Sequence, residues 1–234
     1  MRRLLLLLIF FFLSFSCHSQ NDNDNQAYSF KAGDRFGTGK WYMDREIAHV
    51  MGYQGINWLE RPEREKEENT NRLLKNMNIQ GDDVIADIGA GSGYHVFKMA
   101  PKAKEVYAVD IQAEMLQAIQ DKKEELGVLN IQLVKGSERS VNLPENKIDK
   151  VLMVDVYHEF SYPIEMIASI KDALKPQGEI YLIEYRAEDK TVPIKELHKM
   201  SEAQAVKEMN AAGFKLKENI DNLPWQHCMV FIRE

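Results

Sequence analysis

Cysteine is nearly absent from this sequence, since Cys17 and Cys228 are the two cysteines among 234 residues. If Cys17 is modified or removed, no internal disulfide can form, so disulfides do not indicate the compartment of the protein. Cys228 stands in the apolar run H-C-M-V-F-I, where a small buried side chain is a simpler interpretation than a reactive thiol. Stability must come from a hydrophobic core, and a hydrophobic content of 44% is enough for one α/β domain of ordinary size.

Clusters of basic residues are also lacking. The formal net charge is −6, and no run of Lys and Arg follows the N-terminal segment. Proteins that bind DNA or RNA use such clusters to neutralise phosphates. We therefore expect no nucleic acid among the partners of this protein.

Metal-binding motifs are lacking as well. His158, His198 and His227 show neither the H-x-x-x-H nor the C-x-x-C spacing that places two ligands on one ion. The sequence therefore predicts no metal site.

The sequence has one long apolar run, L-L-L-L-L-I-F-F-F-L-S-F, directly after the positive start M-R-R. Such a run is typical of an export signal, and it is shorter than the ~20 residues of a membrane-spanning helix. The following L-S-F-S-C is similar to a bacterial lipoprotein box, which implies a signal peptide over residues 1–17 with lipid attachment at Cys17. Ordinary cleavage near residues 16–19 is the alternative. Residues 18–30 are rich in Asn and Asp and are expected to form a flexible tether, which would hold the protein at the periplasmic face of a bacterial membrane.

Three glycines alternate in V-I-A-D-I-G-A-G-S-G-Y, at Gly89, Gly91 and Gly93, after an apolar run that carries Asp87. The run predicts a buried parallel strand, and the glycines allow a tight turn and close approach to a ligand. A helix is expected next, with free backbone N–H groups facing the ligand. The spacing D-x-G-x-G-x-G differs from the dinucleotide fingerprint G-x-G-x-x-G. A second strand, V-Y-A-V-D, ends in Asp110, where an acid can accept hydrogen bonds from both hydroxyls of a ribose.

Together these motifs resemble the class I S-adenosylmethionine-dependent methyltransferases, over about residues 70–234. The resemblance implies S-adenosyl-L-methionine as cofactor, with the glycine loop beneath its methionyl part and an acid on its ribose. It also implies an adenine contact after the third strand, N-I-Q-L-V, which this chain can make through Ser137, Glu138 or a backbone group. The predicted cofactor site comprises Asp87, Gly89, Gly91, Gly93, Asp110, Ile111, Ser137, Glu138 and Asp155.

Residues 31–79 are expected to form a mostly helical N-terminal extension, because Ile47, Val50 and Met51 have helical spacing. The resemblance implies that this segment acts as a lid over cofactor and acceptor. The alternative is that its conspicuous side chains simply pack on the domain; they are Trp41, Tyr42, Arg45, Glu46 and Trp58.

From residue 80 to residue 234, predicted strands and helices alternate and the chain ends in two strands with a short connection. The predicted fold class is α/β, a Rossmann-like, doubly wound, seven-stranded sheet with a terminal antiparallel hairpin. A dehydrogenase domain would normally continue with another crossover, so an NAD-linked oxidoreductase is disfavoured.

Polar side chains follow the fourth predicted strand, in V-D-V-Y-H-E-F, at the edge where open α/β sheets bind ligands. His158 is the candidate catalytic base, because its ordinary pKa of about 6.5 suits proton removal near neutrality. Asp155 or Glu159 would orient its ring, and Tyr157 would lie against the cofactor. The alternatives are that His158 packs or caps the strand and that Glu159 is a surface charge.

The fifth strand ends near Glu184, Tyr185 and Arg186, and the loop V-P-I-K-E-L-H-K-M follows. Lys195, His198 and Lys199 are candidates to bind an anionic group there, and a solvated loop is the alternative.

The wider pattern, with R-E-I-A-H-V-M-G, W-L-E-R-P-E-R-E and P-W-Q-H, is similar to predicted exported bacterial methyltransferases of undefined acceptor. The resemblance implies methyl transfer by in-line displacement to an O, N or S atom of a small molecule or an exported macromolecule. A lipid-anchored binding protein that keeps the fold without catalysis is the alternative.

Overall fold

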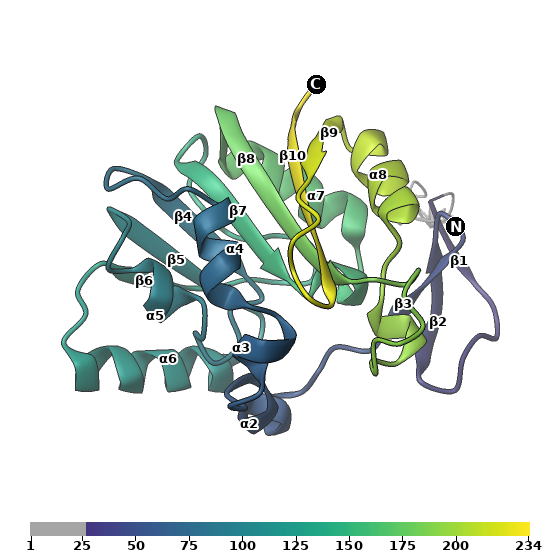
Figure 1. Ribbon diagram of the computed structural model, residues 1–234. Coiled ribbons are helices and arrows are strands. Elements are labelled where there is room, and N and C mark those ends of the chain that lie inside the picture. Colours follow the sequence, from purple (N-terminus) through teal and green to yellow (C-terminus); the bar gives the residue numbers. More distant parts are fainter. Residues whose placement is uncertain (1–26) are drawn as a thin grey trace, which may run out of the picture.

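In the computed structural model, which describes residues 27–234, a seven-stranded sheet forms the centre of the protein (Figure 1). Its strand order is β6-β5-β4-β7-β8-β10-β9. Strands β4 to β8 pair in parallel, whereas β10 is antiparallel to both β8 and β9. The predicted fold class and terminal hairpin are therefore confirmed. The strands are β4 (Val84–Ile88), β5 (Glu105–Asp110), β6 (Ile131–Lys135), β7 (Ile148–Val154), β8 (Leu174–Tyr185), β9 (Phe214–Asn219) and β10 (Gln226–Arg233).

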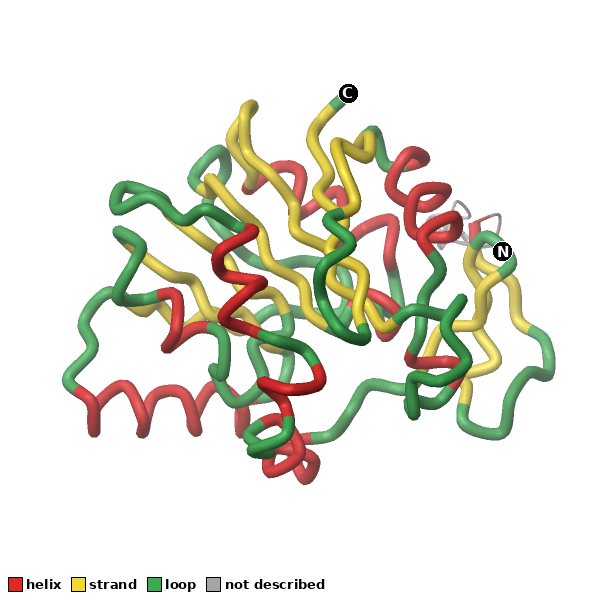
Figure 2. Tube along the Cα trace, viewed as in Figure 1, coloured by secondary structure: helices red, strands yellow, loops and turns green. Residues whose placement is uncertain are grey.

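Helices cover both faces of this sheet (Figure 2). One face packs against α4 (Thr70–Asn76), α5 (Val96–Met99) and α6 (Ala113–Leu126), and the other against α7 (Pro163–Ala173) and α8 (Glu202–Ala211). The central strand β4 is buried along its whole length. Successive side chains of a strand point to opposite faces of the sheet, so the residues of β4 contribute to a hydrophobic core on each face. Val84, Ala86 and Ile88 belong to one core, and Ile85 belongs to the other.

The N-terminal extension differs from the prediction, because its first half is a small antiparallel sheet and not a helix (Figure 1). The strands are β1 (Tyr28–Phe30), β2 (Gly37–Tyr42) and β3 (Arg45–Ala48). Met43 and Asp44 form the turn between β2 and β3, with φ values of 47° and 72°. Two left-handed residues in a two-residue loop match the twist of a hairpin, which fixes the strand pairing. Ile47 thus lies in a strand, and its helical spacing with Val50 and Met51 was misleading.

The second half of the extension is helical, as predicted, but in short pieces. It contains η1 (Tyr53–Gly55), α2 (Ile56–Leu59), α3 (Arg64–Glu67) and then α4. Figure 1 shows that the chain from β3 to α2 runs along the carboxyl edge of the large sheet. The extension is therefore positioned to cover whatever binds at that edge.

A buried ion pair joins the small sheet to the rest of the protein. Arg45 on β3 donates from Nε and Nη2 to the two carboxylate oxygens of Glu208 on α8, at 2.8 and 2.9 Å. The hydroxyl of Tyr157 donates to the same carboxylate at 2.8 Å. The Glu208 side chain is completely buried, so its charge depends on these partners.

The predicted signal peptide, Cys17 and most of the predicted tether lie outside the described residues. The last three residues of the predicted tether form β1 and are therefore part of the small sheet, contrary to the prediction. Within residues 27–234, no helix combines the length and the apolar character that crossing a membrane requires.

Replacing Arg45 by Ala should destabilise the protein by about 3 kcal/mol, because it leaves the Glu208 carboxylate buried without its cation. The matched control is Lys207→Ala, which breaks an exposed pair with Asp44 and should cost less than about 1 kcal/mol. Urea unfolding followed by circular dichroism measures both. Equal losses of unfolding free energy in the two variants would show that the buried pair contributes no more to stability than the exposed one, which would contradict this prediction.

Candidate active site

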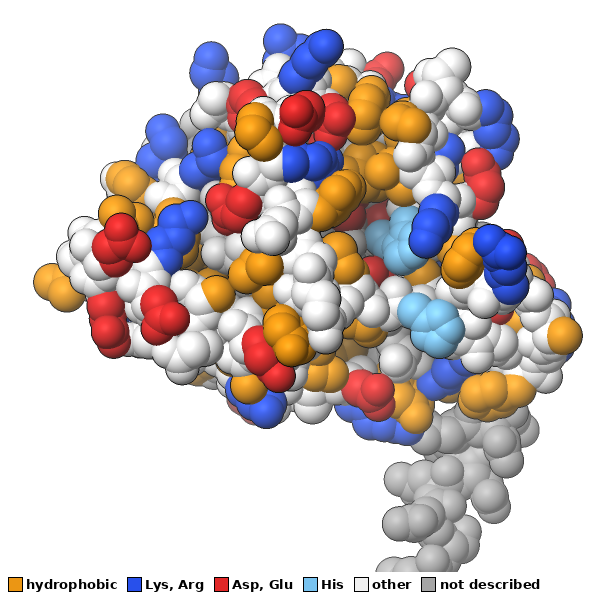
Figure 3. All heavy atoms as spheres, turned by 90° about the horizontal axis from the view of Figure 1, so that it is seen from below, with side chains coloured by type: hydrophobic (Ala, Val, Ile, Leu, Met, Phe, Trp, Pro, Cys, Tyr) orange, Lys and Arg blue, Asp and Glu red, His pale blue; other side chains and the backbone are white. Residues whose placement is uncertain are grey.

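A cavity of about 500 Å³ opens at the carboxyl ends of β4, β5, β7 and β8. This is the edge at which the sequence predicted ligand binding. Figure 3 shows this face of the molecule from below, with histidine side chains beside recessed acidic ones. Val50, Met51, Trp58 and Leu59 of the N-terminal extension form part of the wall, as expected for a lid.

The glycine loop follows β4, and its backbone is held by the neighbouring strand β5. The N–H groups of Gly89 and Ala90 both donate to the carbonyl of Val109, at 2.8 and 3.0 Å. The N–H of Gly91 donates to Asp110 Oδ2 at 2.9 Å. The predicted free N–H groups facing a ligand are therefore absent at these three positions, because they anchor the loop. The following helix α5 has only four residues, so its N-terminus offers few further N–H groups to a ligand.

The three glycines have different roles. Gly89 and Gly91 line the cavity, and Gly91 has a φ of 54°. A Cβ atom there would come within 2.7 Å of Leu59 Cδ1, so the lid lies directly against this position. Gly93 does not line the cavity; a Cβ atom there would lie 2.9 Å from Phe97 and 3.0 Å from Ile119. Gly93 therefore permits close packing beneath the loop and does not itself contact a ligand in the cavity.

Asp110 links the loop, the cavity and the lid. Its Oδ1 accepts from the N–H of Gln112 at 2.8 Å, while Oδ2 accepts from Gly91. Burial raises the pKa of Asp110, although these backbone hydrogen bonds favour its ionised form. The Gln112 side chain in turn bonds the backbone of Met51 and Tyr53, at 3.0 and 2.8 Å. A carboxylate has about four acceptor sites, so Asp110 can still accept hydroxyl groups from a ligand.

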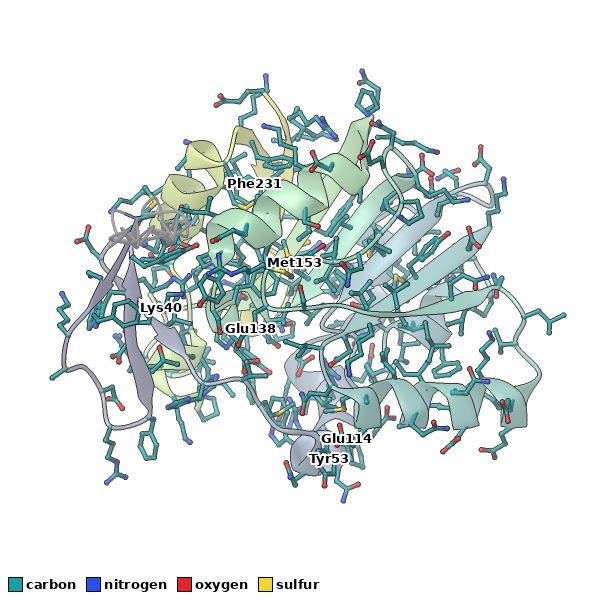
Figure 4. All side chains as sticks on the ribbon, turned by 180° about the vertical axis from the view of Figure 1, so that it is seen from behind. Lys40, Tyr53, Glu114, Glu138, Met153 and Phe231 are labelled. Atoms are coloured by element: carbon teal, nitrogen blue, oxygen red, sulfur yellow. The ribbon has the colours of Figure 1, made fainter. Side chains whose placement is uncertain are left out.

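Ile111, Ser137 and Glu138 also line the cavity, as the predicted cofactor site requires. Ile111 is 39% exposed and offers an apolar surface beside Asp110. The Ser137 hydroxyl accepts from the N–H of Ser140 at 3.0 Å and so stabilises its own turn. Figure 4 shows Glu138 below Met153, at the carboxyl edge of the sheet. Of the two side chains, Glu138 is therefore the stronger candidate for the predicted polar contact with adenine.

Two acids at the edge are buried without full hydrogen bonding. Asp87 Oδ2 and Asp155 Oδ1 are among the buried oxygens of residues 27–234 that have no partner. Burial raises the pKa of Asp87 to about 7, against the opposing effect of nearby Arg64. Burial also raises the pKa of Asp155, although Gln226 donates to its Oδ2 at 2.7 Å. Unpartnered buried carboxyl groups are costly, and a cationic ligand would compensate for them.

His158 lies at the far end of the cavity, but Glu184 orients it, not Asp155 or Glu159. His158 Nδ1 is 2.6 Å from Glu184 Oε2, and His158 Nε2 is 3.0 Å from His198 Nδ1. Both nitrogens are therefore engaged, and His158 can act as the predicted base only if His198 moves. Burial disfavours a charged ring, but the adjacent Glu184 outweighs it and raises the pKa of His158. Burial and the neighbouring His158 lower the pKa of His198 to about 4.

Glu159 belongs to the same group and is not a surface charge, since it is only 8% exposed. Its Oε1 accepts from the N–H of Met51 at 3.1 Å. Burial raises the pKa of Glu159 to about 7. We call His158, Glu159, Glu184 and His198 the polar end of the cavity.

Several other predicted contacts are resolved by the structure. Tyr157 does not line the cavity, because its hydroxyl binds Glu208 in the interior; the prediction that it lies against the cofactor is wrong for this structure. Lys195 and His198 line the cavity, whereas Lys199 is buried outside it. In the extension, Trp58 lines the cavity, and the other four residues do not: Trp41, Tyr42, Arg45 and Glu46.

Sequence reasoning missed Arg64 as a cavity residue. It is 4% exposed, lines the cavity and donates from Nε to Glu68 Oε2 at 2.6 Å. Arg64 stands in a charged run after Pro62, where a buried Arg has the same local sequence pattern as an exposed one. In the structure, Arg64 is the buried residue of α3.

Comparison with known proteins identifies the domain. Residues 86–182 match the family model described as a methyltransferase domain. The uncharacterized methyltransferase YcgJ of Bacillus subtilis is 23% identical over 157 residues, which is 66% of this chain and 62% of that protein. A tRNA U34 carboxymethyltransferase of Desulfotalea psychrophila is 28% identical over 112 residues, 47% of this chain and 35% of that protein. The chain therefore spans less than two thirds of these relatives.

Among solved structures, a SAM-dependent methyltransferase from Aquifex aeolicus superposes with a TM-score of 0.72 at 22% identity, covering 78% of this chain and 98% of that one. This likeness shows the fold. The fold is therefore that of the class I S-adenosylmethionine-dependent methyltransferases, as the sequence predicted, and residues 86–182 match a methyltransferase domain. The relatives named here are all methyltransferases by name, which gives no support to the alternative of a non-catalytic binding protein.

Replacing Asp87 by Asn should remove a pH dependence of stability. Because burial raises the pKa of this acid in the folded state from 3.8 to about 7, its ionisation lowers the stability progressively between these two pH values and causes no further loss above them. The shift corresponds to at most about 4 kcal/mol across that range. The free energy of unfolding, measured at pH 5 and pH 8, should fall less in Asp87→Asn than in the wild type. The exposed α6 substitution Asp121→Asn is the control and should follow the wild type; an unchanged pH slope in Asp87→Asn would refute the assignment.

Proposed function

We propose that this protein transfers the methyl group of S-adenosylmethionine to a small acceptor, or to one protruding group of a larger one, inside the cavity. The observation that carries the proposal is the placement of Asp110, whose carboxylate lies at the end of β5, next to the glycine loop and within the cavity wall. Its position and chemistry fit a ribose with two hydroxyl groups.

The chemistry of the remaining wall fits the rest of the cofactor. Ile111 offers an apolar surface for a base, and Glu138 offers a polar group at its edge. S-adenosylmethionine carries a sulfonium and an ammonium group, and Asp155 presents a buried carboxyl oxygen without a partner. Arg64 is a buried cation in the same wall and suits the carboxylate of the methionyl part.

The wall beyond the cofactor residues suggests the kind of acceptor. Phe160, Met166, Pro193 and Ile194 make this region mainly apolar, and the polar end lies beside it. Small-molecule sites typically have volumes of about 300–1,000 Å³, a range that includes this cavity. The proposed acceptor is therefore a largely apolar molecule or group with a single heteroatom that reaches the polar end.

The main contribution of the protein to the reaction is the alignment of methyl donor and acceptor. Methyl transfer from a sulfonium is an in-line displacement, so the nucleophile must approach the methyl carbon opposite the sulfur. The glycine loop holds the methyl donor, and the polar end holds the acceptor on the opposite side of the methyl group. The lid residues Met51 and Leu59 exclude water from the space between them.

Replacing Asp110 by Asn should weaken S-adenosylmethionine binding by roughly 10- to 100-fold, the value of a hydrogen-bonded charge. Calorimetric titration with S-adenosylmethionine, S-adenosylhomocysteine and NAD measures the effect. The control is Glu114→Gln, an exposed carboxylate at the start of α6 near Tyr53 (Figure 4), which should bind like the wild type. Wild-type protein that is folded but binds neither adenosyl ligand would refute the proposal.

We further propose that residues 1–17 act as an export signal and that Cys17 is lipidated, so that the domain is held at the periplasmic face of a membrane. The support is the sequence pattern, an apolar run behind two arginines followed by L-S-F-S-C.

Replacing Cys17 by Ala should abolish incorporation of radiolabelled palmitate and move the protein out of the membrane fraction of the expressing bacterium. Cys228→Ala is the control and should remain labelled, because Cys228 is buried in β10. Labelling that persists in Cys17→Ala would contradict the proposal.

A further inference from the structure

Three side chains at the polar end bring one potential metal-ligating atom each close to the others. Within residues 27–234, His158, Glu159 and His198 form such a group, with all three atoms inside 4.8 Å of one another. His158 Nε2 is 3.0 Å from His198 Nδ1 and 3.9 Å from Glu159 Oε1. His198 Nδ1 is 3.7 Å from the same Glu159 oxygen.

We propose that these atoms bind a divalent transition-metal ion of the zinc class. Zinc lies about 2.1 Å from imidazole nitrogen and carboxylate oxygen, so two ligands of one ion can be at most about 4.2 Å apart. The three separations, 3.0, 3.7 and 3.9 Å, all meet this limit. Two imidazoles and one carboxylate form a common ligand set of zinc and iron sites that keep a coordination position open.

The fourth residue of the polar end supports His158 as a ligand. Metal-binding histidines typically donate their other ring N–H to a carboxylate, which fixes the tautomer. Glu184, whose side chain is completely buried, lies 2.6 Å from His158 Nδ1. With the proton on Nδ1, the lone pair of Nε2 points towards His198 and Glu159. Glu184 is therefore a positioning residue for the site.

A hydrogen bond between the two rings would explain their separation without an ion. It would not explain why Glu159, held by the N–H of Met51, places one oxygen within reach of both ring nitrogens. Glu159 and Glu184 are two buried carboxyl groups within this one cluster. A divalent cation balances two carboxylates, which makes the whole group favourable to bury.

The ion would lie where the acceptor reaches the cavity wall, since His158, Glu159 and His198 all line it. Its open position would take an anionic oxygen, nitrogen or sulfur atom of the acceptor. This use of the ion rests on the proposed methyl transfer, whereas the metal site itself rests only on the geometry of the polar end.

The test is metal binding by the purified full chain, stripped with a chelator and titrated with Zn²⁺ or Co²⁺. We expect one equivalent to bind with micromolar affinity or tighter, and the Co²⁺ complex should show the visible absorption of a site with nitrogen ligands. His198→Ala removes a ligand on the partly exposed loop and should weaken this binding at least 100-fold. Glu184→Gln should weaken it by roughly 10- to 100-fold and keep the stoichiometry, as substitutions of supporting carboxylates do.

Two controls separate this proposal from the proposed function. His227→Ala removes a histidine that pairs with Glu188 elsewhere and should bind metal like the wild type. Asp110→Asn should lose S-adenosylmethionine affinity but keep metal affinity, and His198→Ala should do the reverse. Wild-type protein without metal binding, or His198→Ala that binds like the wild type, would overturn the metal site. Neither result would affect the cofactor assignment.

Discussion

The concentration of buried acids at the carboxyl edge of the sheet is the constraint on which the rest of the structure depends. Asp87, Asp155 and Glu184 lie at the ends of three adjacent strands, and burial raises the pKa of the first two. Ionised carboxyl groups in such a place need cations or hydrogen-bond donors. Inside the chain they are compensated by Arg64 and His158, which face the same cavity. A cationic cofactor, or a cation at the polar end, would balance the negative charge that Arg64 and His158 leave uncompensated.

This constraint explains why the N-terminal extension is more than a cover. It brings Arg64 to the acids, and its backbone supplies donors at two places: Met51 to Glu159 and Tyr53 to Gln112. Since Gln112 follows Asp110 on the same turn, closure of the lid and order in the cofactor site depend on the same few hydrogen bonds. Ligand binding and lid position should therefore be thermodynamically linked, because each stabilises the arrangement that the other requires.

The glycine loop and Asp110 could be located at the carboxyl edge from the sequence, because these features are local. Asp87, the glycines and Asp110 lie within two strands and one turn, and strand ends can be located from hydrophobic runs. The small N-terminal sheet escaped prediction because its hairpin turn is Met-Asp, without the Asn-Gly or Asp-Gly signal of such turns. The partner of His158 escaped as well, since Glu184 is 26 positions away and only the pairing of β7 with β8 brings them together.

The polar end could not be predicted from the sequence for the same reason, because its residues are brought together by tertiary contacts and not by local ones. Spacing rules detect metal sites whose ligands share one helix or loop, such as H-x-x-x-H. His158 and His198 are 40 positions apart and meet through η2 (Tyr157–Glu159) and η3 (Glu196–His198), two short helical turns that follow adjacent strands β7 and β8. Parallel strands carry their ends to one edge, so residues after different strands can form one ligand group with no pattern in the sequence. For this fold, an absent motif therefore says little about metal binding, whereas the geometry of side chains at the carboxyl edge is directly informative.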